Sequence, residues 1–159
     1  MYKLLLLLLL PVAGFSQSNY NYSNLVLEGG GVRGLAYAGV FSVLEEKNIL
    51  QQIEKVGGSS AGAIAGFMVS VGYTAAEIDS MMQQLPVQQF NDGKGGIWGK
   101  YKRVKNDFGI YEGKKFEQWL QQLAQIKTGN GNITFAELHQ LHLQDKKFRD
   151  FYCTGTNLS

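Results

Sequence analysis

The chain has 159 residues, of which 45% are hydrophobic and 18% are charged. A charged share below the average of about 25% argues against a disordered chain and against a charge-rich rod. The net charge of +2 is too small for nucleic-acid binding through bulk electrostatics. A single cysteine, Cys153, excludes an internal disulfide framework and a cysteine-built zinc site. Ten of the 20 glycines lie between Gly29 and Gly72, so the glycine excess has a local cause.

Residues 1–17 have the layout of a secretory signal peptide. Lys3 precedes seven consecutive leucines, and small residues follow up to Ser16, where we expect cleavage. The leucine run is shorter than the about 20 apolar residues that a membrane-spanning helix needs. We therefore predict an exported protein, which is periplasmic, associated with an outer membrane, or secreted. Residues 18–24 are polar and are predicted to link the signal peptide to a domain over 25–159.

The domain is predicted to begin with a strand, a helix and a second strand. Residues 25–27 form a short apolar run that leads into three glycines, as expected for a buried strand. Apolar residues then recur with helical spacing over 32–44, and Asn48 is expected to end this helix. Residues 53–57 are predicted to form the second short strand. This order of elements indicates neighbouring parallel strands.

The next helix, over 61–71, is expected at the centre of the domain. No charged residue occurs between Lys55 and Glu77. A helix without a polar face has no side to turn toward water and is therefore buried in a globular protein. The turn that precedes this helix is thereby predicted to lie in the middle of the fold.

The second half of the chain contains two capping boxes of the type Thr-x-x-Glu, each of which predicts the start of a helix. A Gly- and Lys-rich segment between them lacks such signals. The predicted elements are helices over 74–85, 116–128 and 134–141, a long surface loop over 91–107 and a closing strand over 148–154. Strands that alternate with helices predict an α/β fold, a three-layer sandwich with a mainly parallel sheet.

The segment from Gly29 to Gly34 fits the pattern GxGxxG between a strand and a helix, which is typical of dinucleotide binding. That function also needs an acidic residue after the second strand to bind a ribose hydroxyl, whereas this strand ends in Gly57 and Gly58. Backbone amides at a helix start bind other anions too, including the oxyanion of a tetrahedral acyl intermediate. Nucleotide binding stays an alternative for this loop.

The sequence Gly58-Ser59-Ser60-Ala61-Gly62 fits GxSxG, the nucleophile elbow, between a strand and a helix as that motif requires. The flanking glycines are expected because the turn is tight, and the serine is presented at the positive end of the buried helix. The amide that follows the serine is an expected oxyanion donor. Both glycine-rich turns follow neighbouring strands and are predicted to form one site. The alternative is that both only pack helices against the sheet.

The pairing of GGGxRG with GSSAG resembles the patatin-like phospholipase family. The resemblance covers residues 25–159, with weaker signals in the second half. It implies a serine lipid acyl hydrolase that acts on phospholipid or other acyl esters, through a Ser-Asp dyad and an acyl-enzyme, without metal or organic cofactor. By this resemblance Ser60 is the nucleophile, and the oxyanion hole is formed by Gly29, Gly30, Gly31, Arg33, Gly34 and Ala61.

The aspartate of the dyad is not identified in the sequence. In the family it lies in an Asp-Gly-Gly or Asp-Gly-Ala motif further along the chain, so we expect a domain truncated at its carboxyl end and a further carboxyl-terminal part. Asp92-Gly93 is the one Asp-Gly pair, but Lys94 follows it, and we interpret it as a turn. A catalytically silent fragment or pseudoenzyme that binds lipid or a partner is therefore the main alternative.

His139 and His142 stand three residues apart on the last predicted helix. No cysteine or acidic ligand is arranged around them for a metal, and we interpret them as surface residues. Because a serine followed by a histidine also suits a hydrolase triad, that arrangement stays open.

A basic and aromatic stretch lies within the predicted loop over 91–107. It contains Trp98, Lys100, Tyr101, Lys102, Arg103 and Lys105. Such a stretch can contact anionic headgroups, which makes peripheral membrane contact one alternative. We favour a solvated, flexible loop, because four charges without an apolar helical face bind membranes poorly.

Overall fold

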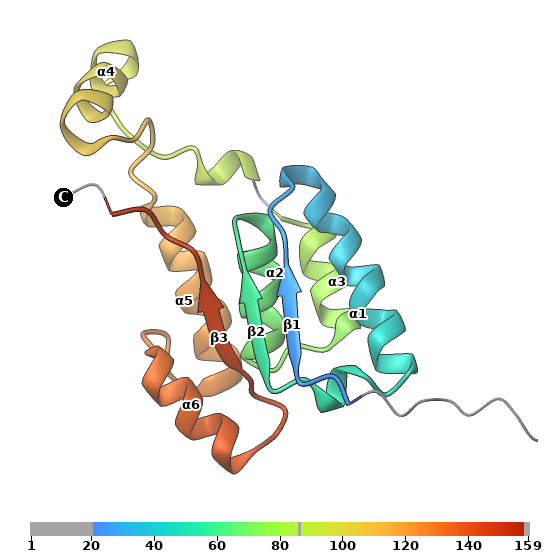
Figure 1. Cartoon of the computed structure of the whole chain (residues 1–159). Helices are drawn as coiled ribbons and strands as arrows, with labels where there is room; N and C mark the ends of the chain where they lie inside the picture. The colour runs from blue at the N-terminus through green and yellow to red at the C-terminus, as the bar shows by residue number, and fades with distance from the viewer. Residues whose placement is uncertain (1–20, 86, 158–159) are drawn as a thin grey trace, which may run out of the picture.

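The computed structural model describes residues 21–85 and 87–157, so the predicted signal peptide lies outside the described residues. A parallel sheet with the order β1-β2-β3 is formed by β1 (Asn24–Leu27), β2 (Lys55–Gly58) and β3 (Asp150–Cys153). Leu27, Gly58 and Cys153 are aligned in register. The carboxyl ends of the strands therefore meet at one edge of the sheet, the upper edge in Figure 1.

The strands alternate with helices, and the predicted α/β class with a parallel sheet is confirmed. The helices, with η for a 3-10 helix, are η1 (Gly31–Leu35), α1 (Ala36–Glu46), η2 (Leu50–Gln52), α2 (Ala61–Ser70), α3 (Ala75–Gln83), η3 (Val87–Phe90), α4 (Gly96–Asp107), α5 (Lys114–Thr128) and α6 (Phe135–Gln144). Among the described residues, no helix is long and apolar enough to cross a membrane.

Helices cover one face of the sheet. Leu27 and Val56 are buried on that face, where α2 contacts each of the strands. The α1 and α3 helices pack against each other and against α2 (Figure 1). On the opposite face, Val26 and Tyr152 are exposed, as the alternation of side chains along a strand requires. The described residues thus form two layers of the expected three-layer sandwich.

The central position predicted for α2 is confirmed. Ala65, Met68 and Val69 are fully buried, and even the polar Ser70 has no exposed surface. A Cβ at Gly66 would lie 3.1 Å from Val56 Cγ1, so the glycine lets the helix approach the sheet closely. Because α2 packs against the sheet, α1 and α3, the turn at its amino-terminal end is held rigidly.

The prediction of a loop over 91–107 is wrong. Residues Gly96–Asp107 form α4, which begins after Gly95 in the left-handed conformation. The glycines that suggested a loop build the entry to this helix, where Gly93, Gly95 and Gly96 all have positive φ angles. The helical spacing of the apolar residues within the segment was masked by its Gly and Lys content.

The α5 helix is tied to α3 by a group of polar contacts. Lys127 Nζ donates to both carboxylate oxygens of Glu77, at 2.7 and 2.8 Å, and lies over the Tyr73 ring. The Tyr73 hydroxyl donates to the Leu123 carbonyl. The hydrogen bond from Lys127, together with those from Thr74, lowers the pKa of the Glu77 carboxyl. These contacts hold the carboxyl-terminal half of α5 against α3 and the segment that precedes it.

Candidate active site

Ser60 stands directly between β2 and α2 with backbone angles of φ 49° and ψ −123°. Few residues other than glycine adopt such a conformation, and its cost is of the order of 1–3 kcal/mol. The turn is held by hydrogen bonds from the Ala63 and Ile64 amides to the Ser60 carbonyl. A strained serine at the end of a strand and the start of a buried helix has the geometry of a nucleophile elbow.

The glycines on either side of Ser60 are required by close backbone contacts. A Cβ at Gly58 would overlap the Gly62 carbonyl, and a Cβ at Gly62 would overlap the backbone oxygens of Leu27 and Glu28. Both contacts are with main-chain atoms, which cannot move aside as a flexible side chain can. The sequence-based explanation for these glycines is therefore confirmed.

The glycine-rich segment after β1 lies against the serine turn. A Cβ at Gly29 would lie 3.1 Å from Ser60 Cβ, and a Cβ at Gly34 would lie 2.8 Å from Ala61 Cβ. Their missing side chains allow η1 to pack against the first turn of α2. The structure thus brings together the two turns that the sequence placed at neighbouring strand ends.

Several backbone amides are available for an oxyanion at this point. No backbone carbonyl of the described residues accepts from the N–H groups of Gly29, Gly30, Gly31 or Ala61. The Arg33 amide, in contrast, donates to the Gly30 carbonyl at 3.1 Å. This amide therefore is not among the free donors, because it already has an acceptor within the turn.

Two members of the predicted site, Gly34 and Ser59, hold the turns in place. Gly34 is buried within η1, where its contact with Ala61 sets the separation of the two turns. Thr154, just after β3, donates a hydrogen bond from Oγ1 to Ser59 Oγ at 3.0 Å. The serine turn is thereby linked to the end of each neighbouring strand.

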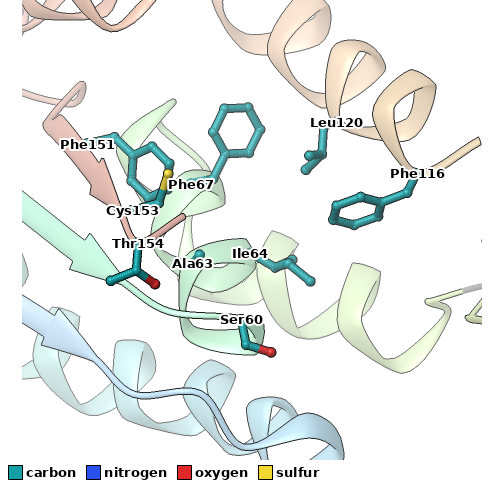
Figure 2. Close-up of a pocket in the computed structure, with 9 residues that line it drawn as sticks. All are labelled: Ser60, Ala63, Ile64, Phe67, Phe116, Leu120, Phe151, Cys153 and Thr154. Atoms are coloured by element: carbon teal, nitrogen blue, oxygen red, sulfur yellow. The ribbon is translucent and has the colours of Figure 1, made fainter. Parts of the chain in front are cut away.

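A cavity of about 430 Å³ extends from Ser60, within the range of about 300–1,000 Å³ that is typical of ligand sites. Its lining is formed by Ser60, Ala63, Ile64, Phe67, Phe116, Leu120, Phe151, Cys153 and Thr154. Figure 2 shows Ser60 at one end and the rings of Phe67 and Phe151 at the far side. A serine beside a mostly apolar cavity can face the carbonyl of an ester whose chain lies in that cavity.

A second cavity of about 360 Å³ lies beyond these rings and shares Phe67 and Phe151 as lining residues. The two rings meet edge to face with centroids 5.8 Å apart. Apart from Ser60, the lining residues of the first cavity were not identified from the sequence, since they come from α2, α5 and the end of β3 and have no common motif.

None of the described carboxylates forms a hydrogen bond with Ser60. Asp92 accepts from the amides of Gly113 and Lys115, at 2.9 and 3.0 Å, and so caps the start of α5. The bond from Lys115 is the main reason why the pKa of the Asp92 carboxyl is lowered. Its role at a turn, rather than as a base, agrees with the interpretation made from the sequence.

The histidines lie away from the serine. His139 Nδ1 is 2.8 Å from Asp150 Oδ1, and Asp150 pairs with Lys55 at the end of the strands opposite to Ser60. A Ser-His triad is therefore not formed. The prediction of two surface residues is wrong for His142, which is buried with its Nδ1 2.8 Å from the Phe148 carbonyl. In the part of the chain that the structure describes, no cluster of side chains is arranged to hold a metal.

Comparison with known proteins agrees with this fold and these motifs. The family model described as patatin-like phospholipase matches residues 25–157, which is most of the chain. The chain therefore belongs to the patatin-like phospholipase family.

Its relatives include proteins from bacteria and fungi. The uncharacterized protein YqhO of Bacillus subtilis is 32% identical over 110 residues, which are 67% of this chain and 37% of that protein. A lysophospholipase nte1 of Emericella nidulans is 39% identical over 74 residues, 46% of this chain and 4% of that protein. The chain thus spans well under half the length of these curated relatives.

Solved structures show the same fold. ExoU of Pseudomonas aeruginosa, crystallised in complex with SpcU, superposes with a TM-score of 0.65 at 21% identity, over 87% of this chain and 33% of ExoU. VipD of Legionella pneumophila superposes with a TM-score of 0.52 at 22% identity, over 79% of this chain and 18% of VipD.

Proposed function

We propose that the protein is a serine lipid acyl hydrolase whose nucleophile is Ser60. The observation that carries this proposal is a strained serine beside free backbone amides at the end of an apolar cavity. Membership of the patatin-like phospholipase family supports it independently. The substrate is a phospholipid or another long-chain ester, because the cavity offers apolar side chains to an acyl chain.

The proposed reaction has two steps. Ser60 Oγ attacks the acyl carbonyl as a base takes its proton, and the negative charge on the carbonyl oxygen is stabilised by N–H groups of the glycine segment and of Ala61. The leaving alkoxide takes that proton and departs, which leaves an ester of Ser60. Water then attacks this ester and releases the fatty acid.

The base is proposed to be the aspartate that the family resemblance places further along the chain, in an Asp-Gly-Gly or Asp-Gly-Ala motif. A carboxyl-terminal part of the protein would bring it to Ser60 across the edge of the sheet. We also propose that the protein is exported through its signal peptide. It then makes peripheral contact with the membrane that holds the substrate. No metal or organic cofactor enters this reaction.

The alternative is a lipid-binding protein without turnover. It is favoured by one observation, that no described carboxylate contacts Ser60. Nucleotide binding gains no support, because the glycine segment lies against a serine and β2 ends in Gly58 without an acidic side chain.

The proposal is tested with the full-length protein and a fluorophosphonate probe. We expect one label per chain, on Ser60, and release of fatty acid from phospholipid vesicles. The variant Ser59→Ala is the matched control, since it removes the neighbouring hydroxyl and leaves Ser60 in place. A folded protein that takes up no label contradicts the proposed nucleophile, whereas labelling without release of fatty acid favours the alternative.

The cavity predicts a dependence on acyl-chain length. Ala63 lines the cavity on α2, one helical turn from Ser60. We expect Ala63→Trp to fill part of the volume and to lower kcat/KM for long-chain esters about tenfold or more, because an acyl chain loses about 0.8 kcal/mol for each methylene left unburied. Hydrolysis of a two-carbon ester should change little.

Kinetics on nitrophenyl esters of increasing chain length measure this effect. Ala76→Trp serves as the control, since Ala76 is exposed on α3 and lies outside the cavity. Equal losses on short and long esters would mean that the acyl chain does not lie along this cavity.

A further inference from the structure

The α4 helix carries an exposed apolar stripe. Ile97, Trp98 and Tyr101 are 85%, 82% and 63% exposed, and Phe108, just after the helix, is 70% exposed. Residues 97, 101, 104 and 108 fall on one side of the helix at about 100° per residue. An exposed apolar patch of this kind marks a site of contact with a partner or a membrane.

Basic side chains border this stripe. The twelve residues of α4 include four basic residues and one acidic residue. At the same helical spacing, Lys100 and Lys105 fall on the two sides of the stripe, and Lys102 lies further round the helix. A helix with an apolar face, flanking lysines and aromatic residues is typical of helices that lie in the interface of an anionic bilayer.

Two anchors connect the segments that flank α4 to each other and to the start of α5. Arg103 donates to the carbonyls of Lys94 and Ile110, which lie before and after the helix, at 2.7 and 2.9 Å. Asp92 binds the amides at the start of α5, and this first turn of α5 carries Phe116, a lining residue of the cavity. The segments that flank α4 are therefore connected to the end of α5 that lines the cavity.

Figure 1 shows α4 standing away from the sheet, beyond the edge toward which the strands point. This is the edge at which β2 ends and the serine turn begins. Contact through α4 would thus turn the serine side of the molecule toward the lipid rather than away from it.

We propose that α4 lies flat on an anionic lipid bilayer, with Ile97, Tyr101, Val104 and Phe108 toward the acyl chains and Trp98 beside Lys105 at the headgroups. Lys100, Lys102 and Lys105 contact lipid phosphates. The basic border of the stripe selects this occupant over a second copy of the chain, because two copies would bring these lysines together. The binding rests on α4 alone and does not require the proposed hydrolysis.

The test uses the full-length protein with Ser60→Ala, so that no lipid is consumed. Sedimentation with vesicles of phosphatidylcholine, with and without phosphatidylglycerol, measures binding. We expect binding to the anionic vesicles that Ile97→Glu with Val104→Glu weakens about tenfold or more. Lys102→Gln with Lys105→Gln should weaken binding to anionic vesicles severalfold and leave binding to neutral vesicles unchanged.

Ile126→Glu is the matched control, because Ile126 is 71% exposed on α5, outside α4. Unchanged binding of the Ile97 and Val104 double variant would overturn the proposal, as would an equal loss in Ile126→Glu. If the protein forms an oligomer in the absence of vesicles and the double variant does not, a second copy covers the stripe, and the proposal is overturned. The same α4 variants, and the protein with α4 unchanged, are also assayed with Ser60 intact on a soluble short-chain ester. With α4 unchanged, hydrolysis of this ester without binding to vesicles means that this proposal fails, and binding without hydrolysis means that the proposed function fails.

Discussion

Replacement of Ser60 by glycine is expected to abolish hydrolysis and to stabilise the fold. The activity should fall by at least about 10³-fold, as for removal of other serine nucleophiles. The backbone angles of φ 49° and ψ −123° cost a side-chain-bearing residue about 1–3 kcal/mol, and glycine adopts them without that strain. Glycine also makes the unfolded chain more flexible, at a cost of about 0.5–1 kcal/mol, so we expect a net gain of about 1 kcal/mol.

Thermal unfolding of the full-length protein and of its Ser60→Gly and Ser60→Ala variants measures this gain. The alanine variant loses the same hydroxyl but keeps a Cβ in the strained conformation, and it should melt close to the wild type. One kcal/mol corresponds to about 2–4 °C in a domain of 150–250 residues. If both variants melt at the same temperature, the turn is not strained as the structure indicates.

Such strain is the mark of a site where function and stability conflict. Ser60 keeps its strained backbone because the turn places its hydroxyl at the edge of the cavity, beside the amides of Gly29 and Gly30. The proposed hydrolase and the proposed lipid-binding alternative differ in whether they need this strained serine. A protein that only binds lipid gains nothing from a strained serine, whereas a nucleophile needs its exposed position.

The serine turn could be predicted from the sequence because the contact between Gly58 and Gly62 is local. The neighbouring glycine segment was recognised by its motif, although its contacts with the turn join distant parts of the chain. Gly58 and Gly62 stand two residues from Ser60, and the strand-turn-helix order fixes what surrounds them. The capping boxes that open α3 and α6 are local as well, and both form as expected, with the threonine and glutamate of each box bonded to each other's backbone.

The cavity, α4 and His142 depend on contacts between distant parts of the chain. Phe116 and Phe151 line one cavity although 35 positions separate them in the sequence. Glycines with positive φ form the entry to α4, and the direction in which they turn the chain cannot be derived from composition. His142 is buried because Phe148, in the segment leading to β3, offers its carbonyl.

Gly62→Ala is expected to destabilise the fold strongly. A Cβ at this position would overlap the backbone oxygens of Leu27 and Glu28 at the end of β1. Overpacking in a core costs about 1–3 kcal/mol, and more where backbone atoms cannot move aside. Since single domains are stable by only about 5–15 kcal/mol, a cost at the upper end of this range or above it removes a large share of the stability.

Gly39→Ala provides the matched control. Gly39 is exposed on α1, and a Cβ there would meet no atom within 4 Å. Alanine should therefore stabilise this helix by about 0.5–1 kcal/mol. Soluble yield and urea unfolding of both variants in the full-length protein measure the difference. A Gly62→Ala protein as stable as the wild type would mean that α2 can move away from β1, and the close approach that brings the glycine segment to Ser60 would then not be enforced by the fold.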